Sequence, residues 1–280
     1  MDLSIIIVSF NTKELTLKCI DSILASRLKI LYEIIVVDNG SSDGSQENFK
    51  RLSDKRIKLI LNDKNLGFAK ANNIGIKSSR GIFKLLLNSD TEIRNSALNS
   101  LYNFAKAKKS VGVVGARLLN PDGSIQGSVY RLPTIKRTIY QYWLNKGKFL
   151  DKYYPESKIP VEVEAVVGGA FLITSETIEK AGLLDERYFM YFEDIDYCRR
   201  VREAGLKVYY LPTAEIIHHH GASPAPEQIR YGVNGKKLAD VENQWRRLIP
   251  SSKIYHGIMK HYLINFIIWS GQKWQKLFKI

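Results

Sequence analysis

The sequence predicts an α/β fold with a mainly parallel, Rossmann-like sheet and helices on both of its faces. Two observations lead to this prediction. Short runs rich in β-branched and other apolar residues, such as "LSIIIVSF" and "EIIVVD", are typical of strands that are buried on both faces. Segments with helical spacing of apolar residues separate such runs over the first 120 residues. Repeated strand–helix units favour parallel pairing with right-handed crossovers.

The first half of the chain supplies most of the predicted sheet. Its expected strands lie at residues 3–10, 33–38, 57–63, 81–93 and 111–120, and its expected helices at residues 12–26, 67–79 and 97–107. The first of these helices places Leu15, Ile20 and Ile23 at helical spacing, and Thr12 is its expected N-cap.

The pattern changes in the second half. Residues 131–160 are basic and aromatic with weak periodicity, which predicts an irregular or helical insertion. A core strand follows, and Gly168-Gly169 interrupts it, as expected of a bulge or a close backbone approach. The remaining expected elements are a helix at 175–182 between a Ser175 cap and a Gly182 stop, a helix at 194–205, and short strands at 207–212 and 214–220.

Length and composition allow one large domain with an appendage, because the chain has 280 residues and a mass of 32.0 kDa. We expect a catalytic domain at 1–225 and a basic, aromatic, helical C-terminal extension at 226–280. Two cysteines are too few for a disulfide scaffold or a cysteine zinc site, and they fit a reducing, cytoplasmic compartment. The acidic start "MDLSIIIVSFN" argues against a signal peptide, and no apolar run is long enough to span a bilayer.

The net charge of +14 is concentrated in the C-terminal part of the chain. Residues 230–280 hold ten Lys and Arg against two acids, a balance of +8. Such a balance suits an anionic membrane, a polyanionic substrate, nucleic acid or simply a solvated surface. The segment "YLINFIIW", with Trp269 and Trp274 nearby, fits either an interfacial helix or a helix packed on the domain.

Polar residues stand where the predicted strands end, which is the edge at which open α/β sheets bind ligands. A carboxylate at Asp38 can accept hydrogen bonds from a nucleobase or a ribose, and one at Asp90 can hold Mg²⁺ or Mn²⁺ on a diphosphate. The chain has neither a P-loop nor a Gly-x-Gly-x-x-Gly motif after a strand, which argues against a P-loop NTPase and a dinucleotide-binding dehydrogenase. The polar strand ends are Ser9 to Asn11, Asp38 with Asn39, residues 62–68, and Asn88 to Asp90.

The order of motifs resembles the inverting glycosyltransferases of family two, which have the GT-A fold, and within them the bacterial rhamnosyltransferase-like branch. The resemblance covers roughly residues 3–223. Seven motifs in the family's order carry it: "SIIIVSFN", "IIVVDNGSSDGS", "NLGFAKANNIGI", "LLLNSDTEI", "VGGAFLI", "FEDIDYCRRVREAG" and "IIHHHGAS".

The resemblance implies a donor site and a metal site. Asp90 matches the last aspartate of the family's metal-binding Asp-x-Asp motif, while Asn88 stands where the first acid is expected. His218 matches a histidine that binds the metal or the diphosphate, and His220 is a weaker candidate for the same role. The residues that the resemblance assigns to the donor nucleotide are Ser9, Phe10, Asn11, Asp38, Gly67, Asn73 and Ser89.

The resemblance also implies an acceptor side. Gly168 and Gly169 match the glycine pair beside the two sugars, and Asp194 matches the general base at the start of a helix. Asp196 lies within helical reach of two arginines, which favours a structural role in ion pairs. For Glu193, contact with the acceptor and support of the base both remain open.

The implied reaction is inverting transfer of a sugar, with rhamnose from dTDP-rhamnose as the best match, to a saccharide or lipid-linked saccharide in cell-surface polysaccharide biosynthesis. It implies Mg²⁺ or Mn²⁺ as cofactor and a peripheral position at the inner face of the cytoplasmic membrane. A nucleotidyltransferase is one alternative, but "SFNTKELT" lacks the glycine-rich loop that a triphosphate needs. A nucleic-acid-binding module is another, and acids at the strand ends argue against it.

Overall fold

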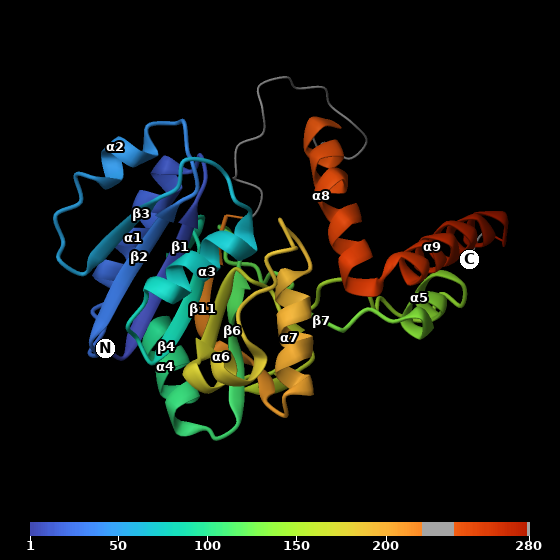
Figure 1. The fold of residues 1–280 in the computed structure, drawn as a ribbon. Coiled ribbons are helices and arrows are strands. Elements are labelled where there is room, and N and C mark those ends of the chain that lie inside the picture. The colour runs from blue at the N-terminus through green and yellow to red at the C-terminus, as the bar shows by residue number, and fades with distance from the viewer. Residues whose placement is uncertain (220–237, 279–280) are drawn as a thin grey trace.

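One mixed sheet forms the centre of the computed structural model, which describes residues 1–219 and 238–278 (Figure 1). Its first half is parallel, as the sequence predicts, with strand order β3-β2-β1-β4. These strands are β1 (Leu3–Ser9), β2 (Tyr32–Asp38), β3 (Ile57–Leu61) and β4 (Phe83–Asn88). Every residue of β2 is buried, which explains its continuous apolar pattern.

The second half of the sheet is not mainly parallel. β10 (Ala170–Thr174) runs antiparallel between β4 and β6 (Val111–Leu119). The two short strands expected at 207–212 and 214–220 form one strand, β11 (Lys207–His218), which is parallel to β6 with an irregular register between Leu211 and Glu215. The remaining short strands are β5 (Thr91–Ile93) and β8 (Val161–Val163), both antiparallel to β11, and the separate pair β7 (Val129–Tyr130) and β9 (Ala165–Val166).

Helices cover both faces of the sheet, as predicted. Alternate residues of β1 divide between two cores: Ile5 belongs to the core that includes residues of α1 and α4, and Ile6 to the core that includes residues of α3 and α7. The helices of the main domain are α1 (Lys13–Ala25), α2 (Ser45–Phe49), α3 (Phe68–Ser78), α4 (Ala97–Ala107), α6 (Ser175–Ala181) and α7 (Glu193–Glu203).

Two expected helix caps differ in the structure. Thr12 precedes α1 but makes no capping bond, because its hydroxyl group contacts those of Ser9, Thr16 and Ser89. Thr174, rather than Ser175, caps α6 by accepting a hydrogen bond from the backbone N–H of Thr177. The hydroxyl group of Ser175 donates to a backbone carbonyl instead. Gly182 ends α6 with a φ of +75°, as predicted.

The C-terminal helices pack on the insertion and on the domain. The C-terminal helices are α8 (Leu238–His256) and α9 (Ile258–Phe278), and the insertion contains α5 (Ile135–Tyr142). α9 lies beside α5 (Figure 1), and Trp143 stacks on Trp274 with ring centroids 5.6 Å apart. The Ser251 hydroxyl of α8 donates to the Met190 carbonyl at 2.9 Å. The domain boundary predicted after residue 225 falls outside the described residues.

Candidate active site

The predicted convergence of strand ends is confirmed by the register of the sheet. Ser9 pairs with Asp38, and Val8 pairs with Asn88, so the ends of β1, β2 and β4 are level. At the far side, His218 at the end of β11 pairs with Thr91, just after Asp90. Polar side chains from distant parts of the sequence therefore lie along one edge.

Asp38 occupies the end of β2 with no exposed surface. One of its oxygens, Oδ2, accepts hydrogen bonds from the Ser41 backbone N–H at 3.0 Å and from the Gln46 side chain at 2.9 Å. The other, Oδ1, is buried without a hydrogen-bond partner among the described residues. An unsatisfied buried acceptor is costly unless a ligand supplies a donor. The geometry fits an N–H or O–H group of a bound nucleotide.

The turn after β1 is joined to the turn after β2. The side-chain oxygen of Asn11 accepts a hydrogen bond from the Ser42 backbone N–H at 2.8 Å, and Asn11 itself has a φ of +52°. Phe10 exposes 38% of its surface beside this junction. The hydroxyl groups of Ser9 and Ser89 instead face α1, at 2.9 Å from Thr16 and 3.0 Å from Thr12. The side chains of Ser9 and Ser89 thus hold the strand ends against the start of α1 by hydrogen bonds.

Asn39 fixes the loop that leads into α3, a role that its position beside Asp38 did not reveal. Its amide group donates to Asn65 at 2.9 Å and accepts from the Leu66 backbone N–H at 3.0 Å. Gly67 follows with a φ of +85°, and a Cβ atom there would lie 2.7 Å from the Phe189 carbonyl oxygen. Only glycine permits this contact between the donor-side loop and the segment before α7.

Asn73, expected at the donor nucleotide, lies elsewhere. Its side-chain amide is buried and bonds both backbone groups of Leu184, donating at 2.8 Å and accepting at 3.1 Å. It donates a third hydrogen bond to Glu186 at 3.1 Å. We therefore assign Asn73 to holding the chain between α6 and α7, and leave it out of the candidate donor site.

The candidate metal ligands lie together at the ends of β4 and β11. Nε2 of His218 is 3.4 Å from Oδ1 of Asp90 and 3.3 Å from Nδ2 of Asn88. Oδ1 of Asn88 is buried with no hydrogen-bond partner among the described residues. A neutral oxygen, a carboxylate and an imidazole suit a divalent cation such as Mn²⁺, so the residues fit the expected metal.

Gln126 orients the His218 ring, although no sequence pattern singles it out. Its side-chain nitrogen donates to the His218 carbonyl at 2.6 Å, and its side-chain oxygen lies 3.0 Å from Nδ1 of the same residue. This pairing favours a proton on Nδ1 and directs the lone pair of Nε2 towards Asp90. Gln126 is thus the outer partner of a candidate metal ligand.

Few residues are available as metal ligands. Within residues 1–219 and 238–278, no three His, Cys, Asp or Glu side chains gather at one point, and the Asn88 amide is the third candidate ligand beside Asp90 and His218. His219 pairs with Glu92 instead, at 2.7 Å. His220 lies outside the described residues, so its candidate role is untested.

Gly168 and Gly169 connect the candidate metal ligands with the candidate base. The Gly168 backbone N–H donates to Oδ2 of Asp194 at 3.0 Å. The carbonyl of Gly169 accepts from the Asn88 backbone N–H at 3.1 Å. A Cβ atom on Gly169 would lie 3.1 Å from Leu118 and 3.7 Å from the His218 ring, so little room is left for a larger residue. The glycine pair predicted from the sequence is therefore a backbone bridge across the site.

Two carboxyl groups open α7, and their environments differ. Asp194 keeps part of its surface accessible, and its oxygens accept hydrogen bonds from the backbone N–H groups of Gly168 and Ile195. Burial raises the pKa of Asp194, and these hydrogen bonds and the Lys152 charge oppose that rise. Glu193 is buried with Oε2 unpartnered among the described residues. Its burial and the adjacent Asp194 charge raise the pKa of Glu193 to about 8.

Exposure and hydrogen bonding separate the roles of the two acids. Burial raises the pKa of both side chains, to about 8 for Glu193, which therefore holds a proton near neutral pH. Asp194 is the more accessible of the two and accepts two backbone hydrogen bonds, which favour its ionised form. Asp194 is therefore the better candidate for a base, and Glu193 supports it from within the protein.

Lys152 and Tyr130 belong to the same cluster, although neither stood out in the sequence. Lys152 is exposed as a whole residue, but desolvation of its ammonium group by the surrounding protein lowers its pKa, and the Asp194 charge partly offsets this effect. Burial raises the pKa of Tyr130 well above its usual value, and the charges of Asp194 and Glu193 raise it further. The ammonium group of Lys152 lies 5.5 Å from the centre of the Tyr130 ring. The insertion thus places the positive charge of Lys152 near the candidate base Asp194.

Asp196 has the structural role predicted for it. Its carboxylate is 2.6 Å from Arg199 and 2.9 Å from Arg200. Arg200 also donates to the Leu183 carbonyl at 3.0 Å, which ties α7 to the preceding loop.

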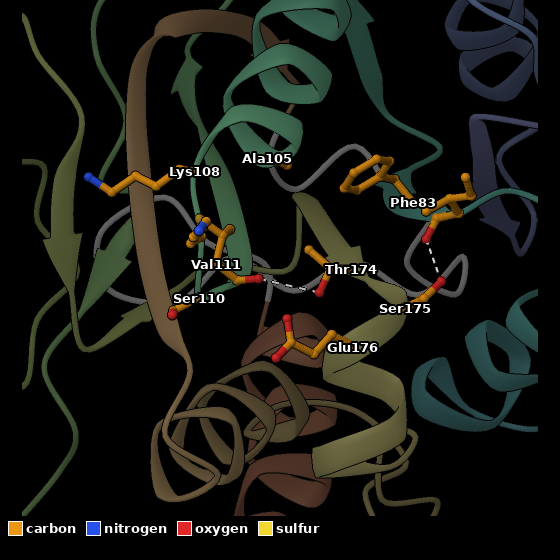
Figure 2. A pocket seen from close by; sticks show the side chains of 10 residues that line it. Phe83, Ala105, Lys108, Ser110, Val111, Thr174, Ser175 and Glu176 are labelled. Carbon is orange, nitrogen blue, oxygen red and sulfur yellow. Dashed lines mark hydrogen bonds between the residues drawn. The ribbon is translucent and has the colours of Figure 1, made fainter.

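The pocket drawn in Figure 2 lies at the opposite edge of the sheet. Phe83 begins β4, Val111 begins β6, and Thr174 ends the antiparallel β10, so all three mark the edge where the parallel strands start. The hydroxyl group of Thr174 donates to the Val111 carbonyl at 3.3 Å. None of the predicted site residues lines this pocket, so we do not connect it with the candidate active site.

Comparison with known proteins gives a consistent result. The model of the family "Glycosyl transferase family 2" matches residues 4–169. An N-acetylglucosaminyl-diphospho-decaprenol L-rhamnosyltransferase of Mycobacterium tuberculosis is 26% identical over 238 residues, covering 76% of each chain. The low-salt glycan biosynthesis hexosyltransferase Agl10 of Haloferax volcanii is 28% identical and covers 91% of this chain and 76% of its own.

Other relatives extend well beyond this chain. The chain is 33% identical over 215 residues to the uncharacterized protein y4gI of Sinorhizobium fredii, and the match covers 74% of this chain but 23% of that protein. Among solved structures, the Pyrobaculum calidifontis mannosyltransferase PcManGT, in complex with GDP-Man and Mn²⁺, has a TM-score of 0.59 at 15% identity, covering 98% of this chain and 75% of its own. GalNAc-T7 with UDP, GalNAc and Mn²⁺ has a TM-score of 0.61 at 18% identity, covering 79% of this chain and 44% of its own. These structures share the GT-A fold of the chain.

Proposed function

The chain belongs to glycosyltransferase family 2, and we propose that it transfers a sugar from a nucleotide-diphosphate donor with inversion at the anomeric carbon. The observation that carries this proposal is the Gly168–Gly169 bridge. It bonds the candidate base Asp194 on one side and the candidate metal ligand Asn88 on the other. An acceptor hydroxyl and a sugar diphosphate have to meet between two such groups.

Asp194 is the proposed general base. It takes the proton of the acceptor hydroxyl as that oxygen bonds to the anomeric carbon, and the bond from this carbon to the diphosphate breaks in the same step. The electron pair of the broken bond leaves with the diphosphate. Glu193 keeps its proton near neutral pH, so Asp194 does not share its charge with a second carboxylate. The Lys152 charge stabilises the ionised form of Asp194.

The donor would lie along the strand ends. Asp38 accepts a hydrogen bond from the nucleotide through its unpartnered oxygen, and the turns at Asn11 and Gly67 border the same space. Asn88, Asp90 and His218 would hold Mg²⁺ or Mn²⁺, which neutralises charge on the leaving diphosphate when bound. Gln126 keeps Nε2 of His218 turned towards that position.

Rhamnose from dTDP-rhamnose is the proposed sugar, and a lipid-linked saccharide the proposed acceptor. The named rhamnosyltransferase relative supports both, and cell-surface polysaccharide biosynthesis is the setting that this chemistry fits. To reach a lipid-linked acceptor, the enzyme would act at the inner face of the cytoplasmic membrane. Among the described helices, none is both long and apolar enough to cross a bilayer, so a peripheral contact is the form we propose.

A screen of nucleotide sugars tests the proposal. Thermal stabilisation and donor hydrolysis are measured for dTDP-, UDP- and GDP-sugars, with and without Mn²⁺. We expect one donor class to bind, Asp38→Ala to weaken its binding by about tenfold, and Asp194→Asn to bind it normally without transfer. Donor binding by no nucleotide sugar, or near-normal turnover of Asp194→Asn, would contradict the proposed reaction.

A further inference from the structure

α9 is apolar on two sides, and only one of them packs on protein. His261, Ile264, Ile267 and Gly271 are buried on the inner side. The outer side leaves large apolar residues in solvent, with exposed fractions of 87% for Met259, 60% for Phe266 and 78% for Leu277. The exposed apolar residues of α9 are Ile258, Met259, Tyr262, Leu263, Phe266, Trp269, Trp274 and Leu277.

The exposed row continues from α9 onto the insertion. Trp143, after α5, stacks on Trp274 of α9, and both rings are partly in solvent. Ile139, Tyr140 and Leu144 are exposed in the same segment. We call these residues, together with the exposed row of α9, the α5–α9 surface. So many exposed apolar side chains on two helices that pack together indicate an interaction site.

The charge around the α5–α9 surface has one sign. Residues 246–278 contain six Lys and Arg and no Asp or Glu, and residues 131–150 contain five Lys and Arg and no acid. Two lysines lie over aromatic rings of the surface: Lys273 is 4.2 Å from the centre of the Trp269 ring, and Lys253 is 5.2 Å from that of Tyr262. Aromatic rings flanked by lysines match the boundary between lipid headgroups and acyl chains.

We propose that the α5–α9 surface docks on an anionic lipid bilayer. The apolar row enters the headgroup region, and the surrounding cations contact the phosphate charge. A second copy of this chain fits the surface less well, because it would bring two acid-free, cationic surfaces together. The proposal stands apart from the choice of donor sugar, since it rests on residues outside the candidate active site.

Binding to lipid vesicles tests this docking. Flotation of the full chain is measured with phosphatidylcholine vesicles and with vesicles that also contain phosphatidylglycerol. We expect binding to the anionic vesicles only, weakened by salt, because the cations supply the charge-dependent part. The double variant Phe266→Glu/Trp269→Glu should bind at least about tenfold more weakly. The matched control is Leu31→Glu/Ile82→Glu, which alters two exposed apolar residues on other elements and should bind like the wild type.

Two controls separate this outcome from the alternatives. Circular dichroism and the thermal shift by donor nucleotide establish that the double variant is folded and has an intact donor site. Light scattering gives the mass of each variant without lipid. Unchanged vesicle binding by the folded double variant would overturn the proposal, as would equal binding to neutral vesicles. If the wild type is a dimer, the double variant is a monomer and neither protein binds vesicles, the α5–α9 surface binds a second copy of the chain instead.

Discussion

The Gly168 backbone N–H donates a 3.0 Å hydrogen bond to the Asp194 carboxylate, and the next residue, Gly169, accepts one from the Asn88 backbone N–H. The candidate base and a candidate metal ligand are therefore attached to consecutive residues of the turn between β9 and β10. Their separation is set by backbone, which is stiffer than side chains. A displacement of either end of the bridge should affect both halves of the reaction.

The charge of Lys152 should set the pH range in which the enzyme works. Asp194 has to be ionised to accept a proton, and the Lys152 charge lowers a pKa that burial raises. Lys152→Met should therefore move the acid limb of the kcat/KM profile to higher pH. Activity should fall roughly tenfold at pH 6 and much less at pH 9.

A pH–rate profile of the purified variant checks this expectation. Lys158→Met, which changes an exposed lysine of the same insertion, is the matched control and should leave the profile unchanged. A uniform loss at every pH would mean that Lys152 affects folding or acceptor binding instead.

Glu193 should make the protein less stable as the pH rises. The folded state raises its pKa from an ordinary 4.5 to about 8, so the folded protein binds this proton more tightly than the unfolded chain does. This stabilisation is fully present below pH 4.5, declines as the pH rises, and is lost by about pH 8. Glu193→Gln keeps a neutral side chain, and should raise the free energy of unfolding at pH 8.5 on the order of 1–3 kcal/mol.

Urea unfolding at pH 5.5 and pH 8.5 measures this effect, which should be smaller at the lower pH. Glu176→Gln, in an exposed pair with Lys180, should change stability by less than about 0.5 kcal/mol at both values. The Glu193→Gln variant should retain transfer activity. Loss of activity together with unchanged stability would give Glu193, and not Asp194, the role of base.

A second carboxylate at position 88 should strengthen the metal site. The Asn88 oxygen is buried and unpartnered among the described residues, beside Asp90 and His218. Asn88→Asp adds charge at the same place, so the Mn²⁺ concentration for half-maximal activity should fall roughly tenfold. Without metal, the added buried charge should lower the melting temperature.

Metal titration of activity and of thermal stability distinguishes these effects. Asn120→Asp, at an exposed turn, is the control and should change neither. If neither Asn88→Asp nor His218→Leu changes the metal dependence, Asn88 and His218 are not metal ligands.

The sequence predicted the parallel half of the sheet well, and the direction of β10 poorly. A strand buried on both faces has the same continuous apolar pattern in either direction, so "AFLIT" carried no sign of its antiparallel pairing. Asn73 illustrates a second limit. An asparagine in a helix of small residues reads equally as a ligand contact or as a clamp on another loop, and the contacts with Leu184 decide for the clamp.

Gln126 and Lys152 illustrate a third limit. Both lie in irregular segments without periodicity, and they reach the site through tertiary packing alone. Asp90 was predicted from its position after an apolar strand, whereas Asp194 and His218 were predicted from the family resemblance. Their outer partners follow no such pattern.

Tyr255 of α8 should hold the base in place without touching the substrate. Tyr191 and Phe192, just before α7, have φ values of +73° and +70°, a conformation that costs about 1–3 kcal/mol per residue and persists only when packing supports it. The Tyr255 ring lies 5.3 Å from the ring of Phe192 and 5.1 Å from the Arg199 guanidinium. Removing the ring should let this turn relax and displace Asp194.

Tyr255→Leu should therefore lower kcat roughly tenfold, with little change in donor affinity. Tyr255→Phe keeps the ring and should restore normal turnover, since the packing of the ring and not its hydroxyl group supports the turn. Tyr262→Leu, an exposed position on α9, serves as the control in assays without membrane. Steady-state kinetics and nucleotide calorimetry separate the two quantities. A Tyr255→Leu variant with unchanged kcat would show that α7 holds Asp194 without help from the C-terminal helices.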